Sequence, residues 1–133
     1  MKNLIKKYKS NEYDLSCSEA VLYAANEKWD LNLSNECFKM VAPYSGGMLT
    51  EDTCGILTAS LAVIGLIFTE TVAHQSPLMV EVSREYVERF KQELKSTNCG
   101  ILKENFRDEV VGCTNIIIKG GMLLEEVVSK YRR

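Results

Sequence analysis

The chain has 133 residues, a formal charge of −2 and an isoelectric point near 5.5. A chain of this length buries on the order of two thirds of the surface of its unfolded form and needs no disulfide or metal merely to fold. The charge excludes a broad electropositive surface for phosphates, so we expect no nucleic-acid partner. We predict one helical domain covering residues 1–133.

The sequence also argues against export and membrane insertion. The basic residues at the N-terminus are followed by Asn11, Glu12 and Asp14, where an export signal would have an apolar segment. The most apolar run, residues 56–68, is shorter than the roughly 20 residues that span a bilayer as a helix. We therefore expect a cytoplasmic protein with no membrane partner.

Apolar residues recur at helical spacing along almost the whole chain, and no window alternates as a half-buried strand would. This pattern predicts an all-α fold, a single compact bundle of about six to seven helices of which four are long. The expected helices cover about residues 2–9, 16–29, 34–42, 50–68, 77–94, 99–106 and 112 onward.

Several residues mark the ends and the packing of these helices. Ser16 with Glu19 forms a capping-box pattern, and Asn98 is a good N-cap residue. Ser76 followed by proline marks another helix start. The helix ending at residue 68 is apolar nearly all round, which predicts a place in the middle of the bundle. The pair at residues 120–121, both glycine, predicts a kink or a close helix contact in the last helix.

Sulfur is the prominent chemistry of this sequence. Five cysteines are many for a cytoplasmic protein of this size, and static disulfides are rare in a reducing compartment. The tetrapeptide CGIL occurs twice, at residues 54–57 and 99–102. No C-x-x-C pair is present, so neither a thioredoxin-type dithiol nor a zinc ribbon is indicated. The cysteines are at positions 17, 37, 54, 99 and 113.

Three cysteines directly follow residues that can cap a helix, namely Ser16, Thr53 and Asn98. Each thiol would then lie in the first turn of a helix, where free backbone N–H groups lower its pKa and favour the thiolate. The cysteine after Gly112 is the fourth candidate. We expect Cys37, inside an apolar face, to be structural. The only histidine, His74, is expected in a connecting turn.

The order of the blocks SCSEAV, GGM, TCGILTASLAVIGL, NCGIL and GCTNII resembles the redox-active family named for its C-GCAxxG-C-C cysteine pattern. The resemblance runs from about residue 16 to 128. It implies a helical fold and a role for four sulfurs, and it names no substrate. The central block departs from the pattern, because Ile56 stands where a small residue is usual and Ala59 where the second glycine is expected. The matching cysteines are Cys17, Cys54, Cys99 and Cys113.

The leading hypothesis is that these four cysteines meet at one end of the bundle and carry out thiol–disulfide chemistry, with no cofactor required. Cys54 is the expected nucleophile, and another of the four resolves the intermediate. The substrate would be a small molecule or an unidentified redox partner.

Two alternatives remain open. The same four sulfurs, Cys17, Cys54, Cys99 and Cys113, are a ligand set suited to zinc or an iron–sulfur cluster. Alternatively, the cysteines only pack the core of a helical interaction domain. Under any of these hypotheses, exposed parts of residues 79–94 are available for a homodimer.

Overall fold

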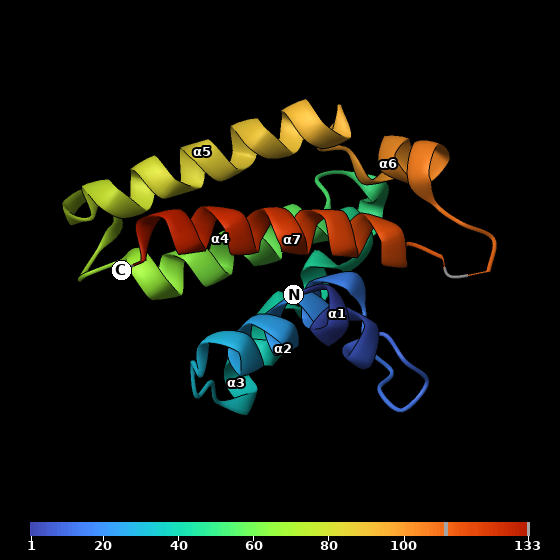
Figure 1. Ribbon diagram of the computed structural model, residues 1–133, viewed down its shortest axis with the longest axis horizontal. Coiled ribbons are helices and arrows are strands. Elements are labelled where there is room, and N and C mark those ends of the chain that lie inside the picture. Colours follow the sequence, from blue (N-terminus) through green and yellow to red (C-terminus); the bar gives the residue numbers. More distant parts are fainter. Residues whose placement is uncertain (111, 133) are drawn as a thin grey trace.

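The computed structural model describes residues 1–110 and 112–132 (Figure 1). Within these residues the chain forms seven α-helices and no strand, which confirms the predicted all-α fold. Four of the helices are long, as expected. They are α1 (Lys2–Tyr8), α2 (Cys17–Trp29), α3 (Asn35–Val41), α4 (Gly55–Phe68), α5 (Pro77–Leu94), α6 (Cys99–Phe106) and α7 (Thr114–Tyr131).

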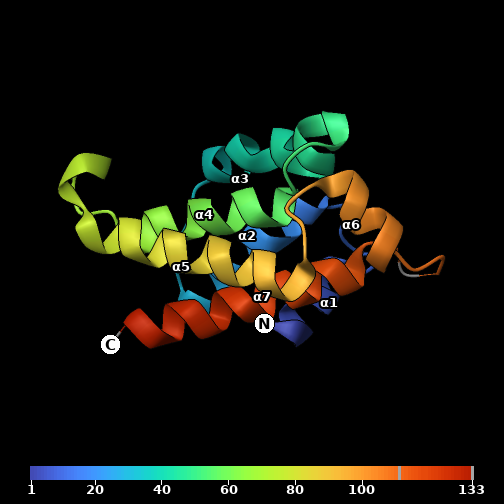
Figure 2. The ribbon, with the colours of Figure 1, turned by 90° about the horizontal axis from the view of Figure 1, so that it is seen from above.

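Helix α4 is the centre of the bundle and packs against α2, α5 and α7. In Figure 1, α4 and α7 run between α5 on one side and α1, α2 and α3 on the other. Figure 2 shows that α4 and α7 begin at the end of the bundle where α6 lies. The all-round apolar surface of α4 is buried by this arrangement, as its composition predicted.

Two of the predicted helix starts use the expected caps. The hydroxyl of Ser16 accepts a hydrogen bond from the Glu19 N–H at 3.4 Å, and the Glu19 carboxylate accepts one from the Ser16 N–H at 3.1 Å. Asn98 accepts from the Ile101 N–H at 3.0 Å. Ser76 behaves differently, because its hydroxyl donates to the Val72 carbonyl at 2.8 Å and so closes the preceding turn.

The start of α4 differs from the sequence prediction. The helix begins at Gly55 rather than between residues 50 and 53, and Cys54 itself is the N-cap residue. Thr53 is therefore not a cap; it forms an isolated antiparallel bridge with Asn98. This bridge holds the chain before α4 against the chain before α6.

A left-handed turn precedes this bridge and explains why α4 starts late. Met48, Leu49 and Glu51 have φ values of 59°, 62° and 57°, within an irregular turn that spans Gly47–Glu51. Each such non-glycine residue costs about 1–2 kcal/mol relative to the right-handed conformation. A right-handed helix cannot continue back through these residues, so it starts only after them.

Helix α7 runs unbroken through its two glycines. Of the two predicted alternatives, the structure therefore shows the close helix contact and not the kink. A methyl group on Gly120 would lie 2.5 Å from Ile56 Cγ2 of α4, and one on Gly121 would overlap Ile5 Cδ1 of α1. Gly120 thus provides the space for Ile56, the bulky departure from the family pattern.

Helix α5 covers one side of the core with Val82, Tyr86, Phe90 and Leu94, all buried. The buried Tyr86 hydroxyl lies 3.0 Å from both Ser60 Oγ of α4 and the Gly120 carbonyl oxygen of α7. The homodimer through the remainder of this helix stays a prediction. In the described residues, every helix is too short or too polar to cross a membrane.

The contact between α7 and α4 makes a testable prediction. Gly120→Ala should destabilise the protein by about 1–3 kcal/mol, because the added methyl group overlaps Ile56 and packed cores tolerate extra volume poorly. Gly65→Ala is the matched control within α4, since its methyl group would have Thr69 Oγ1 at 3.9 Å as its nearest neighbour. This control should gain up to about 1 kcal/mol from helix propensity.

Urea unfolding of both variants measures these changes. The opposite signs are the essential result: if Gly120→Ala were stabilised like Gly65→Ala, the close contact between α7 and α4 would be disproved. Adding Ile56→Ala to Gly120→Ala should give a non-additive change, since the two residues touch.

Candidate functional site

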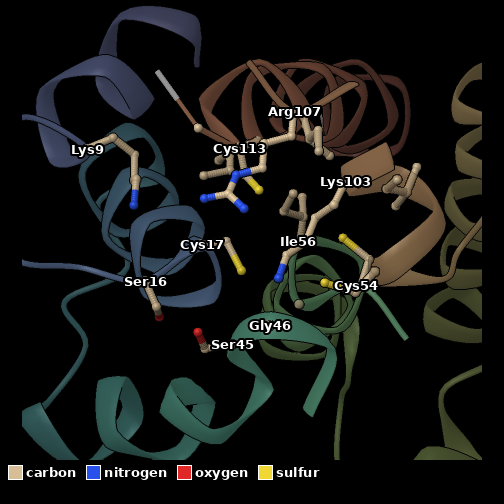
Figure 3. A pocket seen from close by; sticks show the side chains of 16 residues that line it. Lys9, Ser16, Cys17, Ser45, Gly46, Cys54, Ile56, Lys103, Arg107 and Cys113 are labelled. Carbon is tan, nitrogen blue, oxygen red and sulfur yellow. The ribbon is translucent and has the colours of Figure 1, made fainter. Parts of the chain in front are cut away.

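The four cysteines singled out in the sequence line one pocket of about 380 Å³ (Figure 3). Each sits at the start of a different helix: Cys17 opens α2, Cys54 precedes α4, Cys99 opens α6 and Cys113 precedes α7. All are free thiols. We refer to Cys17, Cys54, Cys99 and Cys113 as the pocket cysteines.

The residues directly before the two CGIL segments, Thr53 and Asn98, pair with each other, so both segments start at the same place in the fold. The Cys54 N–H donates to the Thr97 carbonyl at 2.7 Å, and the Cys99 N–H donates to the Asp52 carbonyl at 2.6 Å. These two bonds flank the bridge at residues 53 and 98. Because side chains alternate between the two faces of an extended chain, Cys54 and Cys99 lie on the same face of this bridge.

Glycines near the cysteines permit close approach of neighbouring chain segments. A methyl group on Gly55 would overlap the Tyr44 carbonyl and would lie 3.0 Å from Cys17 Sγ. A methyl group on Gly47 would lie 2.6 Å from Cys99 Cβ. Cys17 therefore packs directly against the first residue of α4, next to Cys54.

The pocket cysteines differ in exposure. Cys54 and Cys99 are buried, with 4% and 8% of their surface exposed. Cys17 and Cys113 are only half-buried. A molecule that enters the pocket therefore has easier access to Cys17 and Cys113 than to the two buried thiols.

Burial also sets the proton affinity of Cys54. Loss of solvent raises the pKa of this thiol to about 12. The backbone N–H groups of Ile56 and Leu57 act in the opposite direction, but their effect is smaller, and nearby Cys17 and Cys99 raise the pKa further. The predicted lowering of the Cys54 pKa is therefore wrong, because desolvation outweighs the helix N-terminus.

Cys99 follows the same rule. Burial raises the pKa of its thiol, and the Lys103 ammonium opposes this rise without cancelling it. Cys17, Cys113 and Glu51 add smaller increases. The predicted lowering is therefore wrong for Cys99 as well. The interactions also show that Cys99 lies within electrostatic reach of both half-buried pocket cysteines.

Three cationic side chains, which the sequence argument missed, complete the pocket wall: Lys9, Lys103 and Arg107. No Asp or Glu is among the described residues that line this pocket. A signal was present in the sequence, since Cys99, Lys103 and Arg107 are spaced four residues apart. That spacing places side chains on one face of a helix.

Hydrogen bonds position two of these cations. Lys103 Nζ donates to Glu51 Oε1 at 3.3 Å, and this bond, with smaller effects of Cys99 and Cys113, raises the lysine pKa. Lys9 Nζ donates to the Leu15 carbonyl at 2.8 Å. The ammonium of Lys103 therefore keeps its charge at neutral pH, beside the thiols.

The other residues considered lie outside this pocket. Cys37 is half-buried on α3, with its sulfur 3.6 Å from Ser34 Oγ. His74 is exposed in the 3₁₀ turn Ala73–Gln75. In the part of the chain that the structure describes, no three His, Cys, Asp or Glu side chains are arranged to hold a metal ion. The zinc and iron–sulfur alternatives thus receive no support from the geometry.

The fold and the pocket define an all-α protein in which separate helix starts bring four free thiols together. Residues 15–127 match the model of the family described as "Putative redox-active protein (C_GCAxxG_C_C)". The chain belongs to this family, which confirms the resemblance seen in the sequence. A search of curated proteins gave no match, and neither did a search of solved structures.

The difference in exposure predicts an order of alkylation. Iodoacetamide at neutral pH should modify Cys17 and Cys113 of the native protein before Cys54, because Cys54 is both buried and protonated. Peptide mass spectrometry over a time course measures the order. In guanidinium chloride the three rates should become similar. Native protein in which Cys54 reacts first would contradict the burial argument.

The raised pKa of Cys54 also predicts a pH dependence of stability. In the unfolded chain this thiol titrates near 9.0, and in the folded protein near 12. Its neutral form therefore stabilises the fold below about pH 9, and this contribution is lost as the pH rises toward 12. The slope is at most about 1.4 kcal/mol per pH unit.

Urea unfolding of wild type and Cys54→Ala from pH 7 to pH 11 tests this contribution. Since lysines and tyrosines titrate in both proteins, only the difference between the two curves is informative. The wild type should lose stability faster than the variant above about pH 9. Parallel curves would show that Cys54 is not held in its neutral form by burial.

Proposed function

We propose that this redox-active family member carries out thiol–disulfide exchange in the pocket, with the pocket cysteines as the reacting groups. The observation that carries the proposal is that four free thiols from four helix starts line one pocket. The family description supports redox activity in general. The proposal also places the protein in the cytoplasm, where a reducing environment keeps such thiols free.

Cys17 is the attacking thiol in this proposal and Cys54 is the resolving thiol. Cys17 is half-buried, so an acceptor can reach its sulfur, whereas Cys54 is buried. The Cys17 sulfur packs against Gly55, the residue next to Cys54. This assignment replaces the hypothesis that Cys54 is the nucleophile, because the nucleophile must be accessible and burial both shields the Cys54 thiol and raises its pKa.

The reaction transfers two electrons from the two thiols to an acceptor disulfide. The Cys17 thiolate attacks one acceptor sulfur, the acceptor S–S bond breaks, and the first acceptor thiolate leaves and takes up a proton. Cys54 then attacks the Cys17 sulfur of the mixed disulfide. The second acceptor thiolate leaves with the Cys54 proton, so the products are a Cys17–Cys54 disulfide and two acceptor thiols.

The remaining pocket cysteines form a second pair in the proposal. Cys99 is within electrostatic reach of Cys17, Cys54 and Cys113. It can therefore receive the disulfide by exchange and pass it to Cys113, which is half-buried and accessible to a reductant. In this proposal Cys17 and Cys54 react with the acceptor disulfide, and Cys99 and Cys113 react with the reductant.

The test is a single oxidation of the fully reduced protein with bis(2-hydroxyethyl) disulfide, followed by peptide mapping without reduction. Wild type should form the Cys17–Cys54 disulfide first. Cys54→Ser should stop at a mixed disulfide on Cys17, and oxidation of Cys17→Ser should be about tenfold slower, because this variant lacks the half-buried thiol that packs beside Gly55, next to Cys54. Cys37→Ser, outside the pocket, is the matched control and should behave as wild type.

A protein that forms no disulfide among the pocket cysteines would refute this function. The helical interaction domain would then be the better description, and joint replacement of Cys17 and Cys54 by alanine would change only stability. A different pair of pocket cysteines that becomes linked first, before the Cys17–Cys54 disulfide, would refute the assigned roles while keeping the exchange chemistry.

A further inference from the structure

Among the described residues, the charged side chains that line the pocket are all cationic, and this bears on the substrate. The protein carries more acidic than basic residues, with 18 Asp and Glu against 16 Lys and Arg. Nevertheless Lys9, Lys103 and Arg107 line the pocket, and among the described residues no carboxylate does. A concave site lined by one sign of charge concentrates ligands of the opposite sign.

The cations approach the thiols from different elements. Lys9 follows α1, Lys103 lies in α6, and Arg107 directly follows α6. Figure 3 shows the side chains of Lys103 and Arg107 pointing into the pocket toward the cysteine sulfur atoms. Lys103 also interacts electrostatically with Cys99 and Cys113, which agrees with a position of its ammonium near these thiols.

Existing partners leave Arg107 with the greatest capacity to bind an anion. Lys103 is partly neutralised by Glu51 at 3.3 Å, and Lys9 uses one N–H on a backbone carbonyl. Among the described residues, Arg107 forms no ion pair. Its planar guanidinium presents two parallel N–H donors, the geometry that matches a carboxylate.

The acidic residues nearest in sequence lie outside this pocket. Asp108 and Glu109 line a separate hollow that Lys103 and Arg107 also border. Asp108 and Glu109 therefore do not line the pocket that contains the thiols. An anionic ligand in the pocket would not meet these two carboxylates directly.

The volume of the pocket limits the size of the ligand. About 380 Å³ lies at the lower end of the range for small-molecule sites, roughly 300–1,000 Å³. The lining also contains apolar side chains, including Ile56, Leu102 and Ile116. The site therefore suits a small organic molecule with a short apolar segment and a terminal anion.

We infer that the pocket selects a small organic disulfide that carries a carboxylate, with Arg107 and Lys103 holding the carboxylate while Cys17 attacks the sulfur. This inference rests on the proposed thiol–disulfide exchange and adds its substrate class. The carboxylate stays unchanged in the reaction. The substrate disulfide accepts two electrons and leaves as two carboxylate-bearing thiols, and a dithiol reductant later restores the Cys17 and Cys54 thiols.

Three disulfides of similar size and different charge test the inference. They are 3,3′-dithiodipropionate, which is anionic, bis(2-hydroxyethyl) disulfide, which is neutral, and cystamine, which is cationic. Each rate of oxidation of the reduced protein is divided by the rate of a single-cysteine peptide with the same probe. This ratio removes the intrinsic reactivity of the probe.

The normalised rate should be on the order of tenfold higher for the anionic probe than for the neutral one, and lowest for the cationic probe. Added salt should reduce the preference, since it screens the charges. Arg107→Gln and Lys103→Gln should each reduce the anionic rate several-fold more than the neutral rate, because loss of a cation beside the thiols affects both probes and loss of the carboxylate contact affects only the anionic one. Lys91→Gln, on the exposed surface of α5, removes the same charge outside the pocket and should have no effect.

The possible outcomes separate the two proposals. Equal normalised rates for the three probes, or an anionic preference that survives in both pocket variants, would overturn the inference and leave the exchange function in place. If no probe produces a disulfide among the pocket cysteines, the exchange function fails and the inference fails with it. The arginine is exposed, so its replacement should not disturb folding.

Discussion

The pocket depends on one short backbone interaction, the antiparallel bridge between Thr53 and Asn98. Its two flanking hydrogen bonds, at 2.7 and 2.6 Å, join the chain before α4 to the chain before α6. These segments are far apart in sequence, and neither forms part of a sheet. The bridge fixes Cys54 and Cys99 on one face of the same small motif. The pocket forms because the starts of α2 and α7 bring Cys17 and Cys113 to this face.

The site also requires helices to pack closely, and two glycines make this close packing possible. Gly55 lets the Cys17 sulfur approach α4, and Gly120 makes room for Ile56. The family pattern has a small residue at the position of Ile56. In this chain the larger isoleucine fits because the facing residue of α7, Gly120, has no side chain. Packed interiors leave few voids, and a change of volume at one position therefore requires a complementary change opposite it.

The protonation of the thiols shows which of two opposing effects prevails. The start of a helix favours a thiolate, and Cys54 does face backbone N–H groups, but its burial raises the pKa to about 12. Desolvation of a charge usually exceeds the effect of one helix terminus. The site therefore combines two half-buried thiols, Cys17 and Cys113, with two buried thiols, Cys54 and Cys99, whose pKa values are raised. The difference between the two pairs comes from how deeply each thiol is buried, because all four lie at helix starts.

The sequence alone determined the helical fold, the capping box at Ser16 and the set of four cysteines, because periodicity and caps are local properties of the chain. It also carried the family pattern that residues 15–127 confirm. Only the tertiary structure decided that Cys54 is recessed and that Lys103 and Arg107 face the thiols. The four-residue spacing of Cys99, Lys103 and Arg107 places these side chains on one helix face, but burial and charge at the site also depend on which distant elements pack against that face.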